Sequence, residues 1–92
     1  MTNDIHQILT ERGDRYGRFE DHAKISQGLK RYMHACLRFK KKELAHDQSE
    51  ALEMIIHKIG RIINGDPDYS DSWRDIAGYA TLVADRLDGV AK

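Results

Sequence analysis

The sequence has few of the residues that cross-link or interrupt a chain. Its 92 residues include one cysteine, Cys36, and one proline, Pro67. A single cysteine excludes an internal disulfide and a paired-cysteine metal or redox site. No apolar run approaches the roughly 20 residues that span a membrane. The first residues also lack the basic segment and hydrophobic stretch of a signal peptide. We therefore expect a cytoplasmic protein without a membrane segment.

An excess of charge of one sign is also lacking. Fifteen Lys and Arg residues balance fifteen Asp and Glu residues, although charged residues make up 33% of the chain. Such a chain has no overall field that attracts nucleic acid or anionic lipid. The basic residues between positions 24 and 42 are typical of a solvated helix face. The five histidines lack the spacing of a zinc motif. We expect neither a nucleic-acid partner nor a zinc site.

Strand-length alternation of β-branched residues is absent, whereas helical periodicity runs through most of the chain. The length predicts a single domain over residues 1–92. We predict four helices, over residues 3–12 with Thr2 or Asn3 as cap, 20–41, 47–64 and 70–87, and a loop at residues 13–17. Asp47 is the expected N-cap of the third helix, and Gly65 and Gly89 follow the ends of the last two. The fold class is therefore all-α, a four-helix bundle-like domain.

Each of the three long helices carries an apolar stripe that predicts a shared core. The stripes consist of Ile25, Leu29, Tyr32, Met33, Cys36 and Phe39, then Leu52, Ile55, Ile56, Ile59, Ile62 and Ile63, then Trp73, Ile76, Ala80, Val83 and Leu87. Cys36 and Trp73 are accordingly predicted to be core residues. We also expect His22 to be packed and His57 to be solvated, because they fall on apolar and polar sides respectively.

The third and fourth helices carry a second stripe opposite the first. Its members are Asp47, Glu50, Met54, Lys58 and Arg61, then Asp71, Asp75, Tyr79, Leu82 and Arg86. Apolar residues among the charges indicate half-burial against another subunit or a ligand. One interpretation is that Asp47, Glu50 and Asp71 are helix caps. In this interpretation Lys58 and Arg61 pair with nearby carboxylates, and Leu82 covers a dimer interface. The other is that the carboxylates share a Mg²⁺ ion while Lys58 and Arg61 bind phosphates.

Three motifs follow one another along the chain: Arg12-x-x-x-Tyr16-Gly17, Lys58-x-x-Arg61, and Asp71-x-x-x-Asp75-x-x-Gly78-Tyr79. With this combination the chain resembles a small uncharacterised family of phage and prophage proteins. The resemblance covers nearly the whole chain, and the last motif is its most specific part. It implies a protein of the host cytoplasm and no settled activity.

A more distant likeness is to the all-α nucleoside triphosphate pyrophosphohydrolases of the MazG and dimeric dUTPase type. Those enzymes bind Mg²⁺ through Glu-Glu-x-x-Glu on one helix and Glu-x-x-Asp on the next. Glu50 and Glu53 fall on the first motif, and Asp71 and Asp75 lie near the second. The first motif lacks its doubled glutamate, Ser72 stands in place of the second motif's glutamate, and Asp71 is offset by one. The likeness implies a MazG-like fold, but these departures leave catalysis open.

Three functions therefore remain open. The first is a Mg²⁺-dependent nucleotide pyrophosphohydrolase, and the second is a protein that binds a nucleotide or phosphorylated small molecule without turnover. The third is an interaction module, such as a phage inhibitor of a host protein. Five residues are the candidates for ligand binding: Arg12, Tyr16, Lys58, Arg61 and Tyr79. Four are the candidates for Mg²⁺ binding: Glu50, Glu53, Asp71 and Asp75.

Oligomerisation is the last expectation. Four short helices cannot cover two apolar-bearing faces on both of the last two helices. We therefore predict that a homodimer, or a dimer of dimers, completes the bundle.

Overall fold

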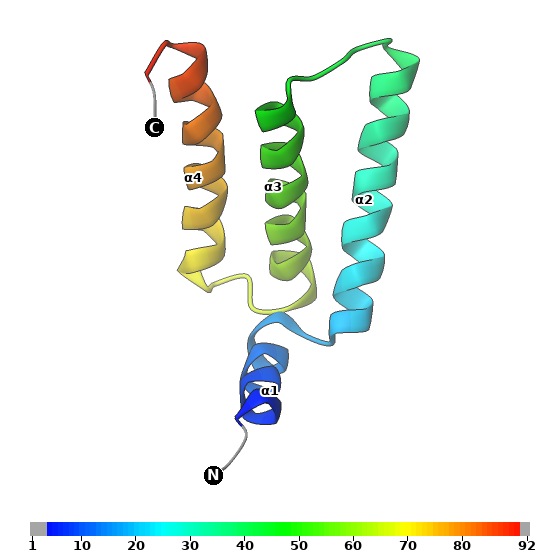
Figure 1. Cartoon of the computed structure of the whole chain (residues 1–92). Helices are drawn as coiled ribbons and strands as arrows, with labels where there is room; N and C mark the ends of the chain where they lie inside the picture. The colour runs from blue at the N-terminus through cyan, green and yellow to red at the C-terminus, as the bar shows by residue number, and fades with distance from the viewer. Residues whose placement is uncertain (1–3, 91–92) are drawn as a thin grey trace.

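The computed structural model describes residues 4–90, which form four α-helices and no strand (Figure 1). The helices are α1 (Ile5–Tyr16), α2 (Phe19–Phe39), α3 (His46–Asn64) and α4 (Ser70–Leu87). The predicted all-α single domain is thus confirmed. None of these helices has the length and apolar content that crossing a membrane requires.

The three long helices lie side by side in one layer, with α3 between α2 and α4 (Figure 1). Each neighbour runs antiparallel to α3, and α1 sits beyond the end of the layer where α2 begins and α3 ends. Among the described residues, α2 and α4 do not contact each other. The layer is open, and the radius of gyration is 15.7 Å, compared with about 12 Å for a compact domain of this length.

The first helix is longer than predicted. It continues through Gly13 to Tyr16, so the prediction of a loop at residues 13–17 is wrong. The helix continues through Gly13 because a single glycine costs a helix only about 1 kcal/mol. Gly17 has a φ of 81°, a left-handed conformation that ends the helix. Thr2 and Asn3, the predicted caps, lie outside the described residues.

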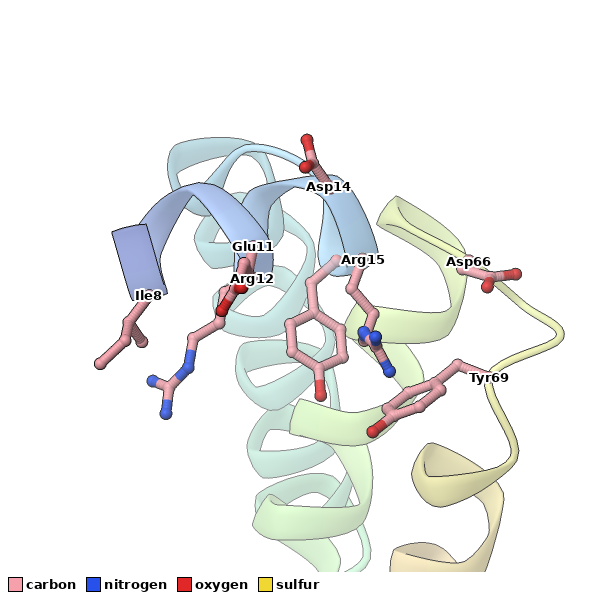
Figure 2. Close-up of a pocket in the computed structure, with 8 residues that line it drawn as sticks. Ile8, Glu11, Arg12, Asp14, Arg15, Asp66 and Tyr69 are labelled. Atoms are coloured by element: carbon pink, nitrogen blue, oxygen red, sulfur yellow. The ribbon is translucent and has the colours of Figure 1, made fainter. Parts of the chain in front are cut away.

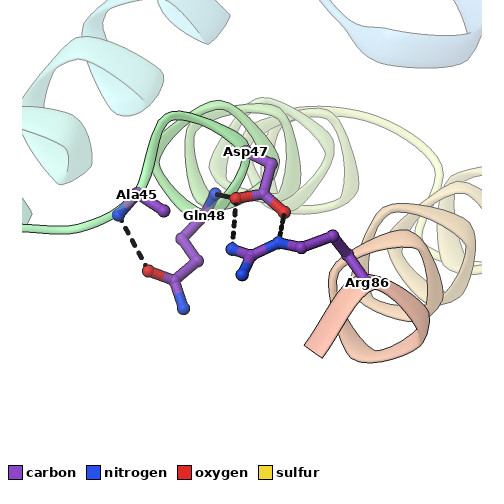
Figure 3. A network of polar contacts seen from close by, with 4 residues as sticks. All are labelled: Ala45, Asp47, Gln48 and Arg86. Atoms are coloured by element: carbon purple, nitrogen blue, oxygen red, sulfur yellow. Dashed lines mark hydrogen bonds and ion pairs between the residues drawn. The ribbon is translucent and has the colours of Figure 1, made fainter. Parts of the chain in front are cut away.

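The start of α3 also differs from the prediction. Ala45, rather than Asp47, is the N-cap residue, and its backbone N–H donates to Gln48 Oε1 at 2.9 Å. Asp47 lies inside the first turn and binds the guanidinium of Arg86 through both carboxylate oxygens, at 2.8 and 2.6 Å (Figure 3). The prediction of Asp47 as the cap is therefore wrong, because a charged partner on α4 holds this carboxylate. The Arg86 guanidinium also keeps the pKa of Asp47 below its ordinary value.

Polar and small residues make several of the contacts between the long helices. Between α2 and α3, His34 contacts Glu53 at 3.1 Å, and the buried residues His22 and Ser26 lie against Gly60. Between α3 and α4, a second ion pair joins Lys58 Nζ to Asp75 Oδ2 at 3.0 Å. Asp47 and Lys58 of the second stripe thus pack against α4, and the predicted pairing of Lys58 with a nearby acid is confirmed. Glu50 is exposed, and Arg61 contacts the Tyr16 ring of α1 instead of a carboxylate.

A single side chain fastens the α1–α2 turn to the end of α3. Asn64 Nδ2 donates to the carbonyl oxygens of Tyr16 and Arg18, at 2.9 and 3.0 Å. In addition, the backbone N–H of Asp66 donates to the carbonyl of Arg15 at 2.8 Å. These three hydrogen bonds set the position of α1 and of its last turn.

The predicted core is not closed within one chain. Ala51 is the only buried apolar side chain among residues 4–90. Cys36 and Trp73 are exposed, the latter by 54%, so their assignment to the core is wrong. The apolar stripes form one partly exposed surface, which we call the apolar side. It consists of Ile25, Leu29 and Met33 in α2, Leu52, Ile55, Ile59 and Ile63 in α3, and Ile76, Val83 and Leu87 in α4.

Candidate ligand-binding site

A cavity of about 540 Å³ lies where the last turn of α1, the start of α2 and the second half of α3 meet. We call it the arginine cavity. Its lining residues are Leu9, Arg12, Gly13, Tyr16, Gly17, Arg18, Phe19, Glu20, His22, His57 and Arg61. The walls are mostly apolar and aromatic, with arginines among them, which is the usual composition of a small-molecule site.

The arginine cavity carries an excess of positive charge. Of its three arginines, Arg18 pairs with the cavity's one carboxylate, Glu20, at 3.2 Å. The Arg61 guanidinium lies 4.1 Å above the centre of the Tyr16 ring, a cation–π contact that fixes its position. Within the described part of the chain, no carboxylate forms an ion pair with Arg12 or Arg61. Two guanidinium groups are therefore available for an anion.

Two histidines form the wall of the cavity between α2 and α3. Their rings meet edge to face with centroids 4.6 Å apart, and His22 Nε2 lies 3.4 Å from His57 Nδ1. His22 is buried as predicted, and its Nδ1 has no hydrogen-bond partner among the described residues. His57 is half-buried, so the prediction that it is solvated is wrong. It is turned inward because its side of α3 faces α2.

Both histidines are neutral near pH 7. Burial lowers the pKa of His57 to about 4, and the nearby Arg61 guanidinium adds to this shift. Burial also lowers the pKa of His22, and the backbone of Gly60 offsets only part of that effect. In a neutral pair, one imidazole donates a hydrogen bond to the other. The remaining ring nitrogens can then bind a ligand or water.

A second, more open cavity of about 810 Å³ is lined by residues of α1 and by Asp66 and Tyr69 (Figure 2). It adjoins the arginine cavity, because Arg12 and Tyr16 line both. Arg15 lies 4.0 Å above the Tyr69 ring there. Its lining includes two arginines but three carboxylates, those of Glu11, Asp14 and Asp66. This balance favours the arginine cavity over the second cavity as a site for an anion.

The structure gathers three of the five predicted ligand-binding residues. Arg12, Tyr16 and Arg61 line the arginine cavity, although Arg12 and Arg61 are 49 positions apart in sequence. Lys58 does not line the cavity. Its side chain is 11% exposed and is paired with Asp75. Tyr79 lines a shallow hollow on α4, together with Asp75 and Leu82.

The four predicted metal ligands do not converge within one chain. Glu53 contacts His34, and Asp75 pairs with Lys58. Asp71 accepts a hydrogen bond from the Tyr69 hydroxyl at 2.8 Å, which raises the pKa of Tyr69. Glu50 is exposed. In the part of the chain that the structure describes, no three His, Cys, Asp or Glu side chains form a group able to hold a metal ion.

Several residues of the cavity were not predicted from the sequence. They are Leu9, Arg18, Phe19, His22 and His57. Gly60 was the one local hint, but it could not be distinguished from Gly13, Gly28 and Gly78, which also lie inside helices and have nothing within 4 Å of an added Cβ. Of these four glycines, only Gly60 has another group close to its backbone. That group is the His22 ring, and an added Cβ on Gly60 would lie 3.0 Å from two of its atoms.

Comparison with known proteins identifies a family but no activity. No curated protein and no solved structure matches the chain significantly. The predicted likeness to MazG-type enzymes and the predicted phage origin therefore stay predictions. Residues 2–87 match the model of a domain of unknown function, DUF6378. This match covers nearly the whole chain, so the protein belongs to the DUF6378 family.

Proposed function

We propose that the protein binds a nucleotide or another phosphorylated small molecule in the arginine cavity. One observation carries the proposal: Arg12 and Arg61 line the same aromatic-walled cavity, and no carboxylate of the described residues neutralises either of them. A guanidinium binds phosphate oxygens through two parallel hydrogen bonds, and these contacts gain strength beside apolar walls.

The two ends of a nucleotide fit different parts of the cavity. The phosphates lie between Arg12 and Arg61. The Tyr16 ring holds the Arg61 guanidinium in place. The base or another apolar group lies against Phe19, which is 78% exposed in the free protein. An aromatic ring gains contact area by stacking on a flat ligand, and such stacking contributes about 1–3 kcal/mol per base. The cavity volume of about 540 Å³ suits a ligand of this size.

The proposal concerns binding and does not include hydrolysis. A metal-dependent reaction needs several acids around one ion, whereas Glu53 and Asp75 each contact a basic side chain of the same chain. The predicted Mg²⁺-dependent pyrophosphohydrolase activity would require acids from two chains, and it stays a prediction.

Titration calorimetry with a panel of nucleoside mono-, di- and triphosphates and inorganic phosphate tests the proposal. We expect saturable binding that tightens with the number of phosphates. Arg61→Gln and Arg12→Gln should each weaken binding by about tenfold or more, because each removes a charged hydrogen-bond donor worth about 1.5–3 kcal/mol. Pyrophosphate release in the presence of Mg²⁺ is measured on the same panel.

Arg31→Gln is the matched control. Arg31 is an exposed residue of α2 that does not line the arginine cavity, and its substitution removes the same charge. An equal loss of affinity in Arg31→Gln and Arg61→Gln would indicate only general charge attraction and would contradict the proposal. Absence of binding to every phosphate compound would contradict it as well.

A further inference from the structure

We infer that a second copy of this chain covers the apolar side of the three-helix layer. The argument begins with α3, whose contacts with its neighbours occupy two arcs. Glu53, His57 and Gly60 contact α2, and Asp47 and Lys58 contact α4. At 100° per residue these arcs leave a third, wider arc that faces neither helix. Leu52, Ile59 and Ile63 lie on this arc.

The flanking helices add their apolar stripes to the same side. Both run antiparallel to α3 (Figure 1), and their contacts with α3 fix their rotation. His22 and Ser26 turn one flank of α2 toward α3, which leaves Leu29 on the side of the isoleucines. Asp75 and Arg86 of α4 reach α3 from the opposite side of the layer, which leaves Leu87 beside the isoleucines.

The exposed area of one chain is large enough to supply a dimer interface. One chain exposes 6954 Å², whereas a folded monomer of this mass exposes about 5,500 Å². This excess of about 1,500 Å² is spread over the whole chain, and burial of about half of it would supply the roughly 800 Å² per partner of an ordinary stable interface. Ile63 is 62% exposed and Leu87 is 59% exposed. A single chain therefore does not gain the favourable free energy of burying these side chains away from water.

A second copy fits this surface better than an unrelated partner. The apolar side is one layer of helices, and two such layers stacked face to face form a complete two-layer helical core. Two-fold symmetry makes the same patch serve both chains. The formal net charge of zero adds no overall repulsion between copies. The arginine cavity includes His57, on the arc of α3 that contacts α2, and Arg61, on the side of α3 opposite Leu52 and Ile63. Assembly and ligand binding therefore use different surfaces.

Sedimentation of the full chain over about 1 to about 100 µM, with thermal melts at each concentration, tests the inference. We expect twice the mass of one chain and a melting temperature that rises with concentration. Ile63→Lys should raise the dissociation constant at least tenfold. Leu82→Lys is the matched control, because Leu82 is 51% exposed on the opposite side of α4 and should change neither mass nor melting temperature.

Three results would overturn the inference. The first is a wild-type monomer of native helical content that melts cooperatively at a temperature independent of concentration. The second is dissociation by Leu82→Lys but not by Ile63→Lys. The third is a monomer whose apolar side is covered only by a different protein. If Ile63→Lys does not fold, the concentration dependence of the wild-type melting temperature decides the question alone, because only an assembly of copies shows it.

Discussion

Gly60 is the residue on which the packing of α2 against α3 depends most. An added Cβ would lie 3.0 Å from His22 Cε1 and Nδ1, so the buried His22 ring would have to shift from its position against α3. We expect Gly60→Ala to be less stable than Gly28→Ala by about 1–2 kcal/mol in urea unfolding. Gly28 is the control because it also lies inside a helix, yet nothing lies within 4 Å of its added Cβ. Alanine there should stabilise the protein by about 0.5–1 kcal/mol. Equal effects of the two substitutions would show that His22 does not pack on Gly60.

The His22–His57 pair makes stability depend on pH. Because the pKa of both histidines is lowered, that of His57 to about 4, the unfolded chain binds more protons than the folded chain between pH 4 and the ordinary value of 6.5. Stability is therefore greatest above pH 6.5 and falls as the pH drops toward 4. Thermal melts from about pH 7.5 to about pH 4.5 measure this loss.

A histidine variant separates this effect from other acid-induced changes. His57→Gln keeps a hydrogen-bonding side chain beside His22 and should flatten the fall in melting temperature between pH 6.5 and 4.5. His6→Gln, at an exposed position of α1, should leave the fall unchanged. A steep fall that persists in His57→Gln would mean that protonation of another group is responsible.

At the scale of elements, the Lys58–Asp75 pair joins α3 to α4. Lys58 is 11% exposed, whereas Asp75 is 49% exposed. Asp75→Asn leaves the covered ammonium without its counter-charge and should lower the free energy of unfolding by about 1–3 kcal/mol. The double variant Lys58→Met/Asp75→Asn should regain much of this loss, because a methionine side chain needs no partner. Glu20→Gln, which breaks the exposed Arg18–Glu20 pair, should change stability by less than about 0.5 kcal/mol. Equal losses in Asp75→Asn and the double variant would contradict this account.

The end of a helix can be predicted from the sequence where a local signal, such as a glycine, marks it. Gly65 and Gly89 follow the last two helices as expected, because a glycine accepts the conformations that end a helix. The sequence predicts a loop at Gly13, but an isolated glycine costs an exposed helix only about 1 kcal/mol, so the helix continues. Gly17, four residues later, ends α1 instead. Asp47 was misread as a cap because its partner, Arg86, lies on another helix.

At the scale of the molecule, periodicity predicts that a face is apolar but not what covers it. The isoleucines of α3 identified a surface that requires burial, yet Ile63 stays 62% exposed, and the ion pairs to α4 and the Gly60 contact with α2 use polar and small residues of α3. Some residues of the arginine cavity could be predicted from the sequence, and others could not. Arg12, Tyr16 and Arg61 stood out as charged and aromatic residues in motifs, whereas His22 and His57 are 35 residues apart and meet only through tertiary packing.

Removal of α1 should weaken ligand binding in the arginine cavity without affecting assembly through the apolar side. This helix supplies Leu9, Arg12 and Tyr16 to the arginine cavity. Asn64 and Asp66 bind it through hydrogen bonds, and Arg61 and Tyr69 contact it through cation–π contacts. The ion pairs that join the long helices involve none of its residues. A chain that begins at residue 18 should therefore keep the mass of the wild-type assembly and a cooperative melt, while its affinity for phosphate compounds falls by more than about tenfold.

The point substitution Asn64→Ala provides the finer version of this test. It leaves two carbonyl oxygens at the α1–α2 turn without their side-chain donor, and each lost hydrogen bond contributes about 0.5–1.5 kcal/mol. Faster amide exchange confined to α1, with weaker ligand binding and unchanged mass, is the expected result. If exchange instead accelerates throughout α2, α3 and α4, the helices unfold as one unit, and α1 belongs to the stability of the layer rather than to the cavity alone.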